Sequence, residues 1–319
     1  MLFSILLCTC NRSASLRRTL ESLSRVRVPG SNAELVVVDN GSTDDTAAVA
    51  RSAGLKNMHV RYLLEPGRGK ARALNAGLDQ ARGDIILFTD DDVLVAEDWL
   101  QQLIIPLLDG GFDAVTGRTI LPDYLQRPWL TPIHRWWLAS SDDAQPHNGV
   151  RELIGANMAV RRSVLERVPR FDPELGPGAL GLGEDSLFGW QLVEAGFKIG
   201  YASTGAAVHH LDVSRLRRNN WLAEARKHGR TEAYQQYHWN GLDIKNPRSK
   251  SLWLGMKLIS RRLLQRPPAL QEEGCSLWEM SYVQDLAFCT QFSREHQRPR
   301  NYVRRGLTRR DNDSVSVKE

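Results

Sequence analysis

The sequence has no long apolar run and few cysteines. None of its 319 residues lies in a run approaching the roughly 20 apolar residues that a membrane-spanning helix needs. The apolar first ten residues lack the basic start and small-residue cleavage site of a signal peptide, so we expect a buried strand there. The four cysteines (Cys8, Cys10, Cys275 and Cys289) have no zinc-binding spacing. We therefore expect free thiols in a reducing cytoplasm and exclude a disulfide-rich or zinc-ribbon protein.

The net charge of +5 is unevenly distributed along the chain. Residues 1–212 carry 21 Lys/Arg against 26 Asp/Glu, whereas residues 213–319 carry 21 against 11, so the balances are −5 and +10. A basic segment is attracted to an anionic membrane surface, an anionic substrate or nucleic acid. Because residues 1–212 are acidic and no recognition motif is present, we expect no nucleic-acid partner.

Apolar runs and helical patterns alternate over the first part of the chain. The expected strands cover residues 2–10, 34–39, 59–64 and 85–89, and the expected helices cover 13–23, 44–53, 71–81 and 184–195. This alternation predicts an α/β fold with a mostly parallel sheet and helices on both faces. In such sheets ligands bind beyond the carboxyl ends of the strands.

Three consecutive aspartates, Asp90, Asp91 and Asp92, follow the strand expected over residues 85–89. Because side chains alternate along a strand, Asp90 and Asp92 are expected to point the same way. Two such carboxylates without a basic neighbour in sequence are costly unless a cation neutralises them, and oxygen ligands suit Mg²⁺ or Mn²⁺. His209 ends another apolar run and could add a ligand. A solvated acidic turn is the alternative, but the position after a buried strand favours a metal.

Two further features near strand ends admit two interpretations each. Asp39 is either a turn residue or an acceptor of hydrogen bonds from a base or ribose. Lys70 and Arg72 follow a Gly-Arg-Gly turn at the start of a helix. They could hold a diphosphate, together with backbone N–H groups, or form a solvated basic helix start.

Glu184 and Asp185 open a helix behind a glycine-rich loop over residues 176–183. Acidic residues in a first helical turn are favoured by the helix dipole, so capping alone could explain them. The loop instead favours a general base at the edge of a pocket, with a segment that closes over the substrate.

Taken in order, these segments resemble the family 2 glycosyltransferases of the GT-A fold. The matching motifs are Cys10-Asn11-Arg12, residues 37–44, residues 69–77, residues 87–92, residues 155–158 and Gly183-Glu184-Asp185. The resemblance covers roughly residues 1–212. It implies a Rossmann-like catalytic domain over that range, with residues 1–110 as the nucleotide-binding half and 111–212 as the acceptor half. Beyond that range, the sequence pattern predicts a helical, basic extension over residues 213–295 and a disordered tail over residues 296–319.

The resemblance also implies roles for individual residues. Nucleotide-sugar contacts are implied for Thr9, Asn11, Arg12, Asp39, Lys70, Asn75, Asp90, Asp91 and Asn157. A divalent cation, Mn²⁺ or Mg²⁺, would be held by Asp90 and Asp92, with His209 as a further ligand. Asp185, beside Glu184, would be the catalytic base. The implied reaction moves a hexose, with inversion, from a nucleotide-sugar donor, UDP-sugar favoured, to a hydroxyl of a glycan or lipid-linked acceptor.

Two positions depart from the family pattern. Many members carry Asp at the position of Asn40, where an amide still fits a nucleotide-contacting turn. Many also carry Arg at the position of Gln191, and this departure weakens the acceptor half of the resemblance slightly and leaves the donor half alone. A nucleotidyltransferase or a non-catalytic nucleotide-sugar-binding module remain alternatives. The first would need a glycine-rich phosphate loop after the first strand, which residues 8–15 lack, and the second would not need a base.

Residues 251–266 predict an amphipathic helix with an apolar and a basic face. Such helices lie on anionic bilayers, although the apolar face could equally pack on the catalytic domain while the basic face is solvated. A lipid-linked acceptor favours membrane contact. We therefore expect a cytoplasmic protein, peripheral on the inner face of the cell membrane.

Overall fold

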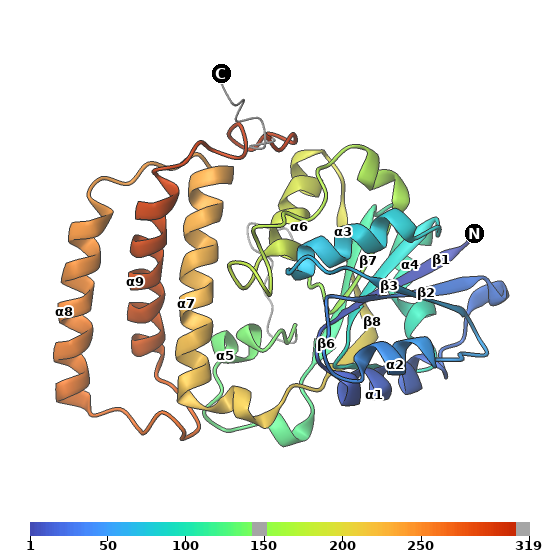
Figure 1. Cartoon of the computed structure of the whole chain (residues 1–319), viewed down its shortest axis with the longest axis horizontal. Coiled ribbons are helices and arrows are strands. Elements are labelled where there is room, and N and C mark those ends of the chain that lie inside the picture. Colours follow the sequence, from blue (N-terminus) through green and yellow to red (C-terminus); the bar gives the residue numbers. More distant parts are fainter. Residues whose placement is uncertain (142–151, 311–319) are drawn as a thin grey trace. The chain divides into compact units, whose positions relative to one another are not determined.

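The computed structural model describes residues 1–141 and 152–310 of the chain (Figure 1). These residues form two compact units. Within the described ranges, the first unit consists of residues 1–141, 152–179 and 183–212, and the second consists of residues 180–182 and 213–310.

The described part of the first unit is built on one eight-stranded sheet with the order β3-β2-β1-β4-β7-β6-β8-β5. The strands are β1 (Phe3–Thr9), β2 (Ala33–Asp39), β3 (His59–Leu64), β4 (Ile85–Asp90), β5 (Val93–Val95), β6 (Ala114–Ile120), β7 (Asn157–Arg161) and β8 (Ile199–His209). Four neighbouring pairs, β3–β2, β2–β1, β1–β4 and β6–β8, are parallel. The pairs β4–β7, β7–β6 and β8–β5 are antiparallel. The sheet is mixed and mostly parallel, which confirms the predicted α/β architecture.

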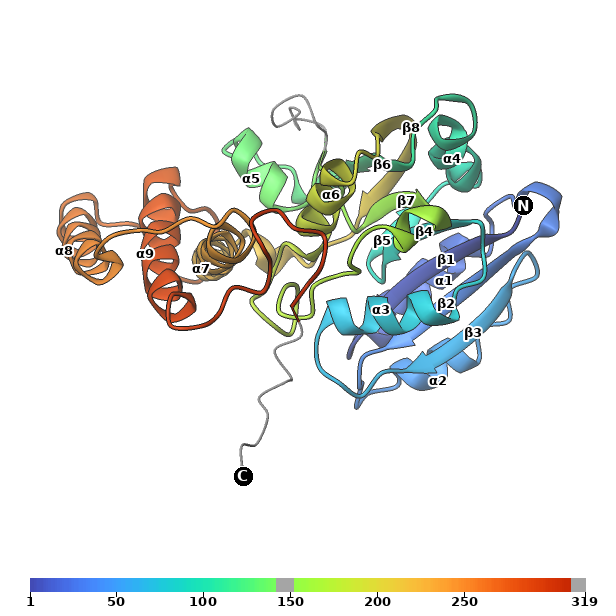
Figure 2. The same ribbon diagram turned by 90° about the horizontal axis from the view of Figure 1, so that it is seen from above.

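Helices cover both faces of this sheet (Figures 1 and 2). They are α1 (Ser13–Leu23), α2 (Thr46–Arg51), α3 (Lys70–Gln80), α4 (Trp99–Asp109), α5 (Pro132–Trp137) and α6 (Glu184–Glu194). In Figure 1, α3 lies on one side of β1 and β2, and α1 and α2 lie on the other. On the side of α3, Phe188 of α6 packs against Phe171, which meets Phe88 of β4 edge to face.

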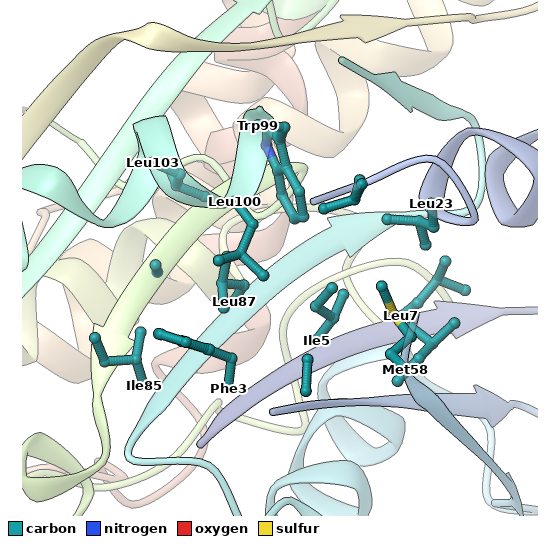
Figure 3. Close-up of a cluster of buried hydrophobic side chains, with 14 of the residues drawn as sticks. Phe3, Ile5, Leu7, Leu23, Met58, Ile85, Leu87, Trp99, Leu100 and Leu103 are labelled. Carbon is teal, nitrogen blue, oxygen red and sulfur yellow. The ribbon is translucent and has the colours of Figure 1, made fainter. Parts of the chain in front are cut away.

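The main apolar core lies between the sheet and the helices α1, α2 and α4 (Figure 3). Phe3, Ile5 and Leu7 occupy alternate positions of β1 and point into this cluster, as the alternation of a strand requires. Trp99 at the start of α4 is buried in the same cluster. The intervening residues of β1 are buried as well, because α3 covers the opposite face. A strand buried on both faces reads as a continuous apolar run, and this is the pattern at the start of the sequence.

A glycine lets α3 approach the sheet closely. A Cβ added at Gly77 would lie 2.2 Å from a methyl carbon of Leu6 and 2.9 Å from one of Val38. A larger residue would therefore push α3 away from β1 and β2. The close packing fixes the first turn of α3, where Lys70 stands, over the carboxyl ends of the strands.

Most predicted elements agree with the structure to within two residues at each end. The second helix is shorter than expected, because α2 begins at Thr46 rather than at residue 44 and ends at Arg51 rather than at residue 53. The Asp44 carboxylate accepts a hydrogen bond from the Thr46 backbone N–H at 3.0 Å. Asp44 therefore precedes the helix and satisfies one of its free N–H groups, as aspartates near helix starts commonly do.

The second unit contains three long helices. They are α7 (Arg218–Tyr234), α8 (Pro247–Gln265) and α9 (Leu277–Glu295). Both views show α9 between α7 and α8 (Figures 1 and 2). The approach of α7 to α9 depends on Gly229, where an added Cβ would lie 2.1 Å from the backbone oxygen of Gln284.

The tail expected over residues 296–319 is packed in its first part. Asn301 and Tyr302 are buried, and Asn301 donates a hydrogen bond to the Tyr234 hydroxyl at 2.6 Å. The segment is polar in composition, so the sequence did not indicate that these two residues are buried. The prediction of disorder is therefore wrong for residues 296–310. Residues 311–319 lie outside the described residues.

Within the described ranges, none of the helices combines the length and apolar character needed to cross a membrane.

Candidate functional site

A cavity of about 360 Å³ opens in the first unit at the carboxyl ends of β1 and β4. It is lined by Cys8, Thr9, Cys10, Arg12, Asn40, Arg68, Gly69, Lys70, Asp90, Asp91, Pro177 and Gly178. The two strands are hydrogen-bonded neighbours with Cys8 opposite Asp90, so their last residues meet at one edge of the sheet. The cavity lies where an α/β sheet is expected to bind its ligand.

Lys70, the first residue of α3, is paired with carboxylates in this cavity. Its Nζ lies 2.6 Å from Oδ1 of Asp90 and 3.7 Å from Oε1 of Glu184. Burial lowers the pKa of Lys70, but the two carboxylates outweigh burial and raise the pKa above its ordinary value. Lys70 therefore remains a cation at neutral pH and is not a solvated helix start.

Glu184 and Asp185 differ in their surroundings although they are adjacent at the start of α6. Glu184 is buried, and burial together with the charge of Asp185 raises the pKa of Glu184 to about 7, against the opposing charge of Lys70. Asp185 is partly exposed, and its Oδ2 accepts a hydrogen bond from the Gly155 backbone N–H at 2.8 Å. A Cβ at Gly155 would lie 3.3 Å from that oxygen and 3.7 Å from the Lys70 ammonium. Gly155 therefore lies close to both the Asp185 carboxylate and the Lys70 ammonium.

Asp92 has two partners distant in sequence. Nη2 of Arg12 lies 2.6 Å from its Oδ2, and Nε2 of His209 lies 3.1 Å from its Oδ1. Burial works to raise the pKa of Asp92, but the hydrogen bond from His209 and the charge of Arg12 outweigh it and hold the pKa well below the usual range. Asp92 is therefore a carboxylate at neutral pH.

The hydrogen bonds of His209 determine which ring nitrogen faces the carboxylate. Nδ1 lies 3.2 Å from the backbone oxygen of Leu138, which can only accept, so Nδ1 carries the proton. With Nδ1 protonated, Nε2 can meet Oδ1 of Asp92 in two ways. In the imidazolium it donates to the carboxylate, which lowers the pKa of Asp92, and in the neutral ring it offers a lone pair that can bind a cation. A backbone carbonyl on the far nitrogen is typical of metal-binding histidines.

Asp90, Asp92 and His209 form a possible metal site. One ligand atom from each residue lies within 4.8 Å of the others, although Asp90 ends β4 and His209 ends β8. The donors are carboxylate oxygens and an imidazole nitrogen, which suit a divalent cation.

Asp90 and Asp92 have basic partners in the fold, contrary to the expectation from the sequence. The sequence shows no basic residue near Asp90 and Asp92, but the fold brings Lys70 to the first and Arg12 to the second. Their charges are already partly compensated, so repulsion between them does not by itself require a metal. The convergence with His209 carries the metal assignment instead.

Thr9 and Asp91 line the cavity together. The Thr9 hydroxyl donates to Oδ2 of Asp91 at 2.7 Å, and Nε of Arg12 lies 3.2 Å from Oδ1. Burial raises the pKa of Asp91 to about 7, although the charge of Arg12 opposes the rise. The structure thus places three of the predicted nucleotide-sugar residues side by side.

Asn11 and Asp39 hold the turns beside the cavity. Oδ1 of Asn11 accepts from the Thr43 backbone N–H at 2.7 Å. Asp39 is buried, with Oδ1 accepting from the Ser42 N–H at 2.8 Å and Oδ2 from the Tyr62 hydroxyl at 2.9 Å. Neither residue is among those that line the cavity. The turn interpretation of Asp39 accounts for both of its oxygens.

Asn75 and Asn157, both predicted to contact the donor, are held by protein groups. Asn75 exchanges two hydrogen bonds with the backbone of Phe171, at 2.8 and 3.1 Å. Asn157 is 0% exposed, and its amide bonds Trp99 and two backbone carbonyls, all within 2.9 Å. Both amides connect segments of the fold. Asn157 is fully buried, whereas Asn75 is partly exposed and keeps one N–H and one lone pair beyond these bonds, so donor contacts by these residues stay a prediction.

Several cavity residues were not predicted. Asn40 lines the cavity and donates to the Gly67 backbone oxygen at 2.6 Å, which shapes the turn before α3. Gly178 also borders the cavity, and it packs closely on the turn before α3, since an added Cβ would lie 2.9 Å from the Cα of Gly69. The glycine-rich loop over residues 176–183 indicated that the backbone makes a close contact there. The sequence did not indicate that the contact is with Gly69.

A mostly parallel, helix-covered sheet with carboxylates at the ends of its central strands defines a GT-A type glycosyltransferase fold. A structure of the mannosyltransferase PcManGT from Pyrobaculum calidifontis, in complex with GDP-Man and Mn²⁺, matches with a TM-score of 0.61 at 18% identity, over 91% of this chain and 86% of that one. A structure of S. aureus TarS 1-349 in complex with UDP matches with a TM-score of 0.52 at 18% identity, over 93% and 92%.

The sequence comparisons assign the family. The family described as glycosyl transferase family 2 matches residues 4–168, just over half of the chain, and the chain belongs to this family. Glycosyltransferase AglE of Haloferax volcanii is 25% identical over 208 residues, which are 65% of this chain and 66% of that protein. The pre-mycofactocin glycosyltransferase of Mycobacterium tuberculosis is 28% identical over 235 residues, 70% and 45%. The chain thus spans between about half and two thirds of the length of these relatives.

Proposed function

We propose that this protein moves a hexose, with inversion, from a nucleotide-sugar donor to a hydroxyl of a glycan or lipid-linked acceptor. The observation that carries the proposal is the convergence of Asp90, Asp92 and His209 beside a cavity that Asp90 also lines. A metal bound beside a cavity of this size suits the diphosphate of a nucleotide sugar.

Three side chains would hold the cation, which we expect to be Mn²⁺ or Mg²⁺: Asp90, Asp92 and His209. Such an ion, when bound, stabilises negative charge that develops on a leaving diphosphate. Lys70 stays charged 2.6 Å from Asp90, where it orients that carboxylate and adds positive charge to the cavity. Arg12 does the same for Asp91 and Asp92.

Asp185 is the expected catalytic base. Its Oδ2 accepts one backbone hydrogen bond from Gly155 and its Oδ1 accepts one from Ser186, so each oxygen keeps a lone pair that can accept a proton from an acceptor hydroxyl. Glu184 is the competing candidate, since a buried carboxyl with a pKa of about 7 is also suited to proton transfer. Because Glu184 faces Lys70, we assign it the positioning of that ammonium.

The nucleotide is expected to be UDP, as in the TarS complex, with GDP as the alternative that the PcManGT complex suggests. Both matched structures support the fold and leave the base open. A titration with each nucleotide decides between them.

Calorimetric titration of the full chain with UDP and with GDP, with and without Mn²⁺, tests the proposal. We expect nucleotide binding that depends on Mn²⁺ and weakens by at least about a hundredfold in Asp92→Ala, because a ligand of the cation is lost. Asp109→Ala, at an exposed position at the end of α4, is the matched control and should bind as the wild type does.

Two results would contradict the proposal. Binding that is equal with and without the metal, or unchanged in Asp92→Ala, would remove the cation from the donor site. Failure of both nucleotides to bind under every condition would instead favour a degenerate module or a different donor.

A further inference from the structure

Helix α8 has two apolar faces, and one of them is exposed. Leu254 and Leu258 are 4% and 5% exposed and form the face that packs in the second unit, where α9 is the neighbouring helix. The other face is formed by Leu252, Met256, Ile259 and Leu263, which are 69%, 57%, 61% and 73% exposed. Their spacings of four, three and four residues place them in one line along the helix, which we call the exposed stripe.

The exposed stripe is not explained by packing within the second unit. A single exposed leucine is ordinary, but a line of four apolar side chains over three turns is typical of a surface that meets an apolar partner. Leu264, adjacent to the stripe, is exposed as well. The sequence-based alternative was packing of the apolar face on the catalytic domain, whereas Leu254 and Leu258 pack within the second unit.

The charges of α8 are of one sign. The helix contains Arg248, Lys250, Lys257, Arg261 and Arg262, and its sequence includes no Asp or Glu. At 3.6 residues per turn, Arg248 falls beside the exposed stripe, and Lys257 lies farther round the helix on the opposite side, next to Trp253. Among these five side chains, only that of Arg262 forms an ion pair with a carboxylate: its Nε lies 2.7 Å from Oε1 of Glu279 on α9. The partner of this surface must therefore combine apolar material with negative charge.

An aromatic side chain accompanies one basic flank. Trp253 is half exposed, and the Lys257 ammonium lies over its ring, 3.7 Å from the centroid. Tryptophan and lysine side chains of this kind are favoured at the boundary between lipid headgroups and acyl chains, where the ring meets both and the ammonium reaches water.

We propose that α8 binds the surface of an anionic lipid bilayer, with the exposed stripe among the outer acyl chains and the basic flanks at the headgroups. A second copy of the chain fits less well, because two α8 helices facing each other would bring their basic flanks together without any acidic partner on the helix. A bilayer supplies both the apolar layer and the negative charge. The proposal concerns the second unit and does not depend on the donor or acceptor.

Co-sedimentation of the full chain with phosphatidylglycerol and with phosphatidylcholine vesicles tests this proposal. We expect binding to the anionic vesicles that weakens as salt is raised, and weaker binding to the neutral ones. Ile259→Gln/Leu263→Gln should reduce the partition coefficient by about tenfold to a hundredfold, because two apolar side chains no longer enter the acyl region. Glutamine keeps helix propensity, so the variant should show the helical circular dichroism of the wild type.

The matched control is Ile105→Gln/Leu108→Gln, which changes two apolar residues of 45% exposure on α4 of the first unit. It should bind vesicles as the wild type does. A second variant, Arg248→Gln/Lys257→Gln, leaves the stripe intact and should reduce binding to phosphatidylglycerol by about tenfold or more, with little change for phosphatidylcholine.

Three results would overturn the proposal. The first is absence of wild-type binding to phosphatidylglycerol vesicles at low salt. The second is unchanged binding of the stripe variant. The third is a wild-type dimer in light scattering that dissociates in the stripe variant while vesicles remain unbound, since a second copy would then cover the stripe.

Discussion

The two units place their charged side chains in different environments. In the first unit, Asp91 and Glu184 stand at or beside an open cavity, and burial raises the pKa of each to about 7. In the second, Glu279 is fully buried and is held by Arg218 at 2.9 Å and Arg262 at 2.7 Å. Burial works to raise the pKa of Glu279, but these hydrogen bonds outweigh it and lower the pKa.

The difference separates charges that are available for chemistry from charges that hold a fold. A carboxyl that titrates near neutral pH beside a cavity can exchange protons or bind a cation. A carboxylate enclosed by two guanidinium groups has no capacity left for a ligand. The line of exposed apolar side chains lies on the other unit: the four residues of the exposed stripe belong to the second unit. We therefore expect substrates at the first unit and an apolar, anionic surface at the second.

The largest effect is expected for Asp185→Asn. Removing a general base should lower the transfer rate by about a hundredfold to ten-thousandfold. Nucleotide binding should be unchanged, because Asp185 does not line the donor cavity. The measurement is the rate of nucleoside diphosphate release from the donor sugar that the titrations select, together with nucleotide affinity.

Glu184→Gln is the matched comparison at the adjacent position. It keeps the shape of the side chain beside Lys70, so we expect a loss of no more than about tenfold in rate. A larger loss in Glu184→Gln than in Asp185→Asn would make Glu184 the base, as its pKa of about 7 would allow.

The next largest effect is expected for Glu279, the carboxylate that Arg218 and Arg262 enclose in the second unit. Glu279→Gln leaves Arg218 buried without a full counter-charge, and breaking such a pair costs about 3–5 kcal/mol of unfolding free energy. Urea unfolding followed by circular dichroism measures the loss. Asp285→Asn, exposed on the same helix, is the control and should stay within about 0.5 kcal/mol.

The difference between wild type and Glu279→Gln should depend on pH. Because the folded pKa of Glu279 is lowered, its contribution is complete above the ordinary glutamate pKa of about 4.3 and is lost as the pH falls through the folded value. A difference that stays constant into acid, or a variant as stable as the wild type, would show that the pair does not stabilise the unit. Retained Mn²⁺-dependent nucleotide binding would show that the first unit folds without it.

The order of strands and helices was readable from the sequence because local patterns determine it. Strands β1 and β4 are buried and mostly apolar up to the site, and this pattern identified both the parallel sheet and the edge where ligands bind. His209 was a reasonable ligand for the same reason, since it ends an apolar run. The structure brings it to Asp92 although 117 residues separate them.

Pairings between distant segments could not be predicted in the same way. Nothing near Asp90 in sequence indicates that Lys70 reaches it, and the motif containing Asn157 does not reveal that Trp99 occupies its amide oxygen. A motif gives the type of residue needed at a position, whereas its hydrogen-bond partners depend on which elements the fold makes neighbours. For α8, the sequence predicted an apolar face but not which leucines face α9.

The smallest effect is expected at Ile259, and it sharpens the comparison between buried and exposed apolar residues. Ile259→Gln should change the unfolding free energy of the second unit by no more than about 0.5 kcal/mol, because the side chain is exposed and glutamine is a good helix former. Leu258→Gln, one position earlier, should cost about 2–5 kcal/mol, since it removes a buried apolar group and introduces an amide without a partner. Urea unfolding of both variants, without lipid, provides the measurement. Equal losses would mean that Ile259 is covered in the folded protein, and the exposed stripe would then be part of a protein interior rather than a surface for a bilayer.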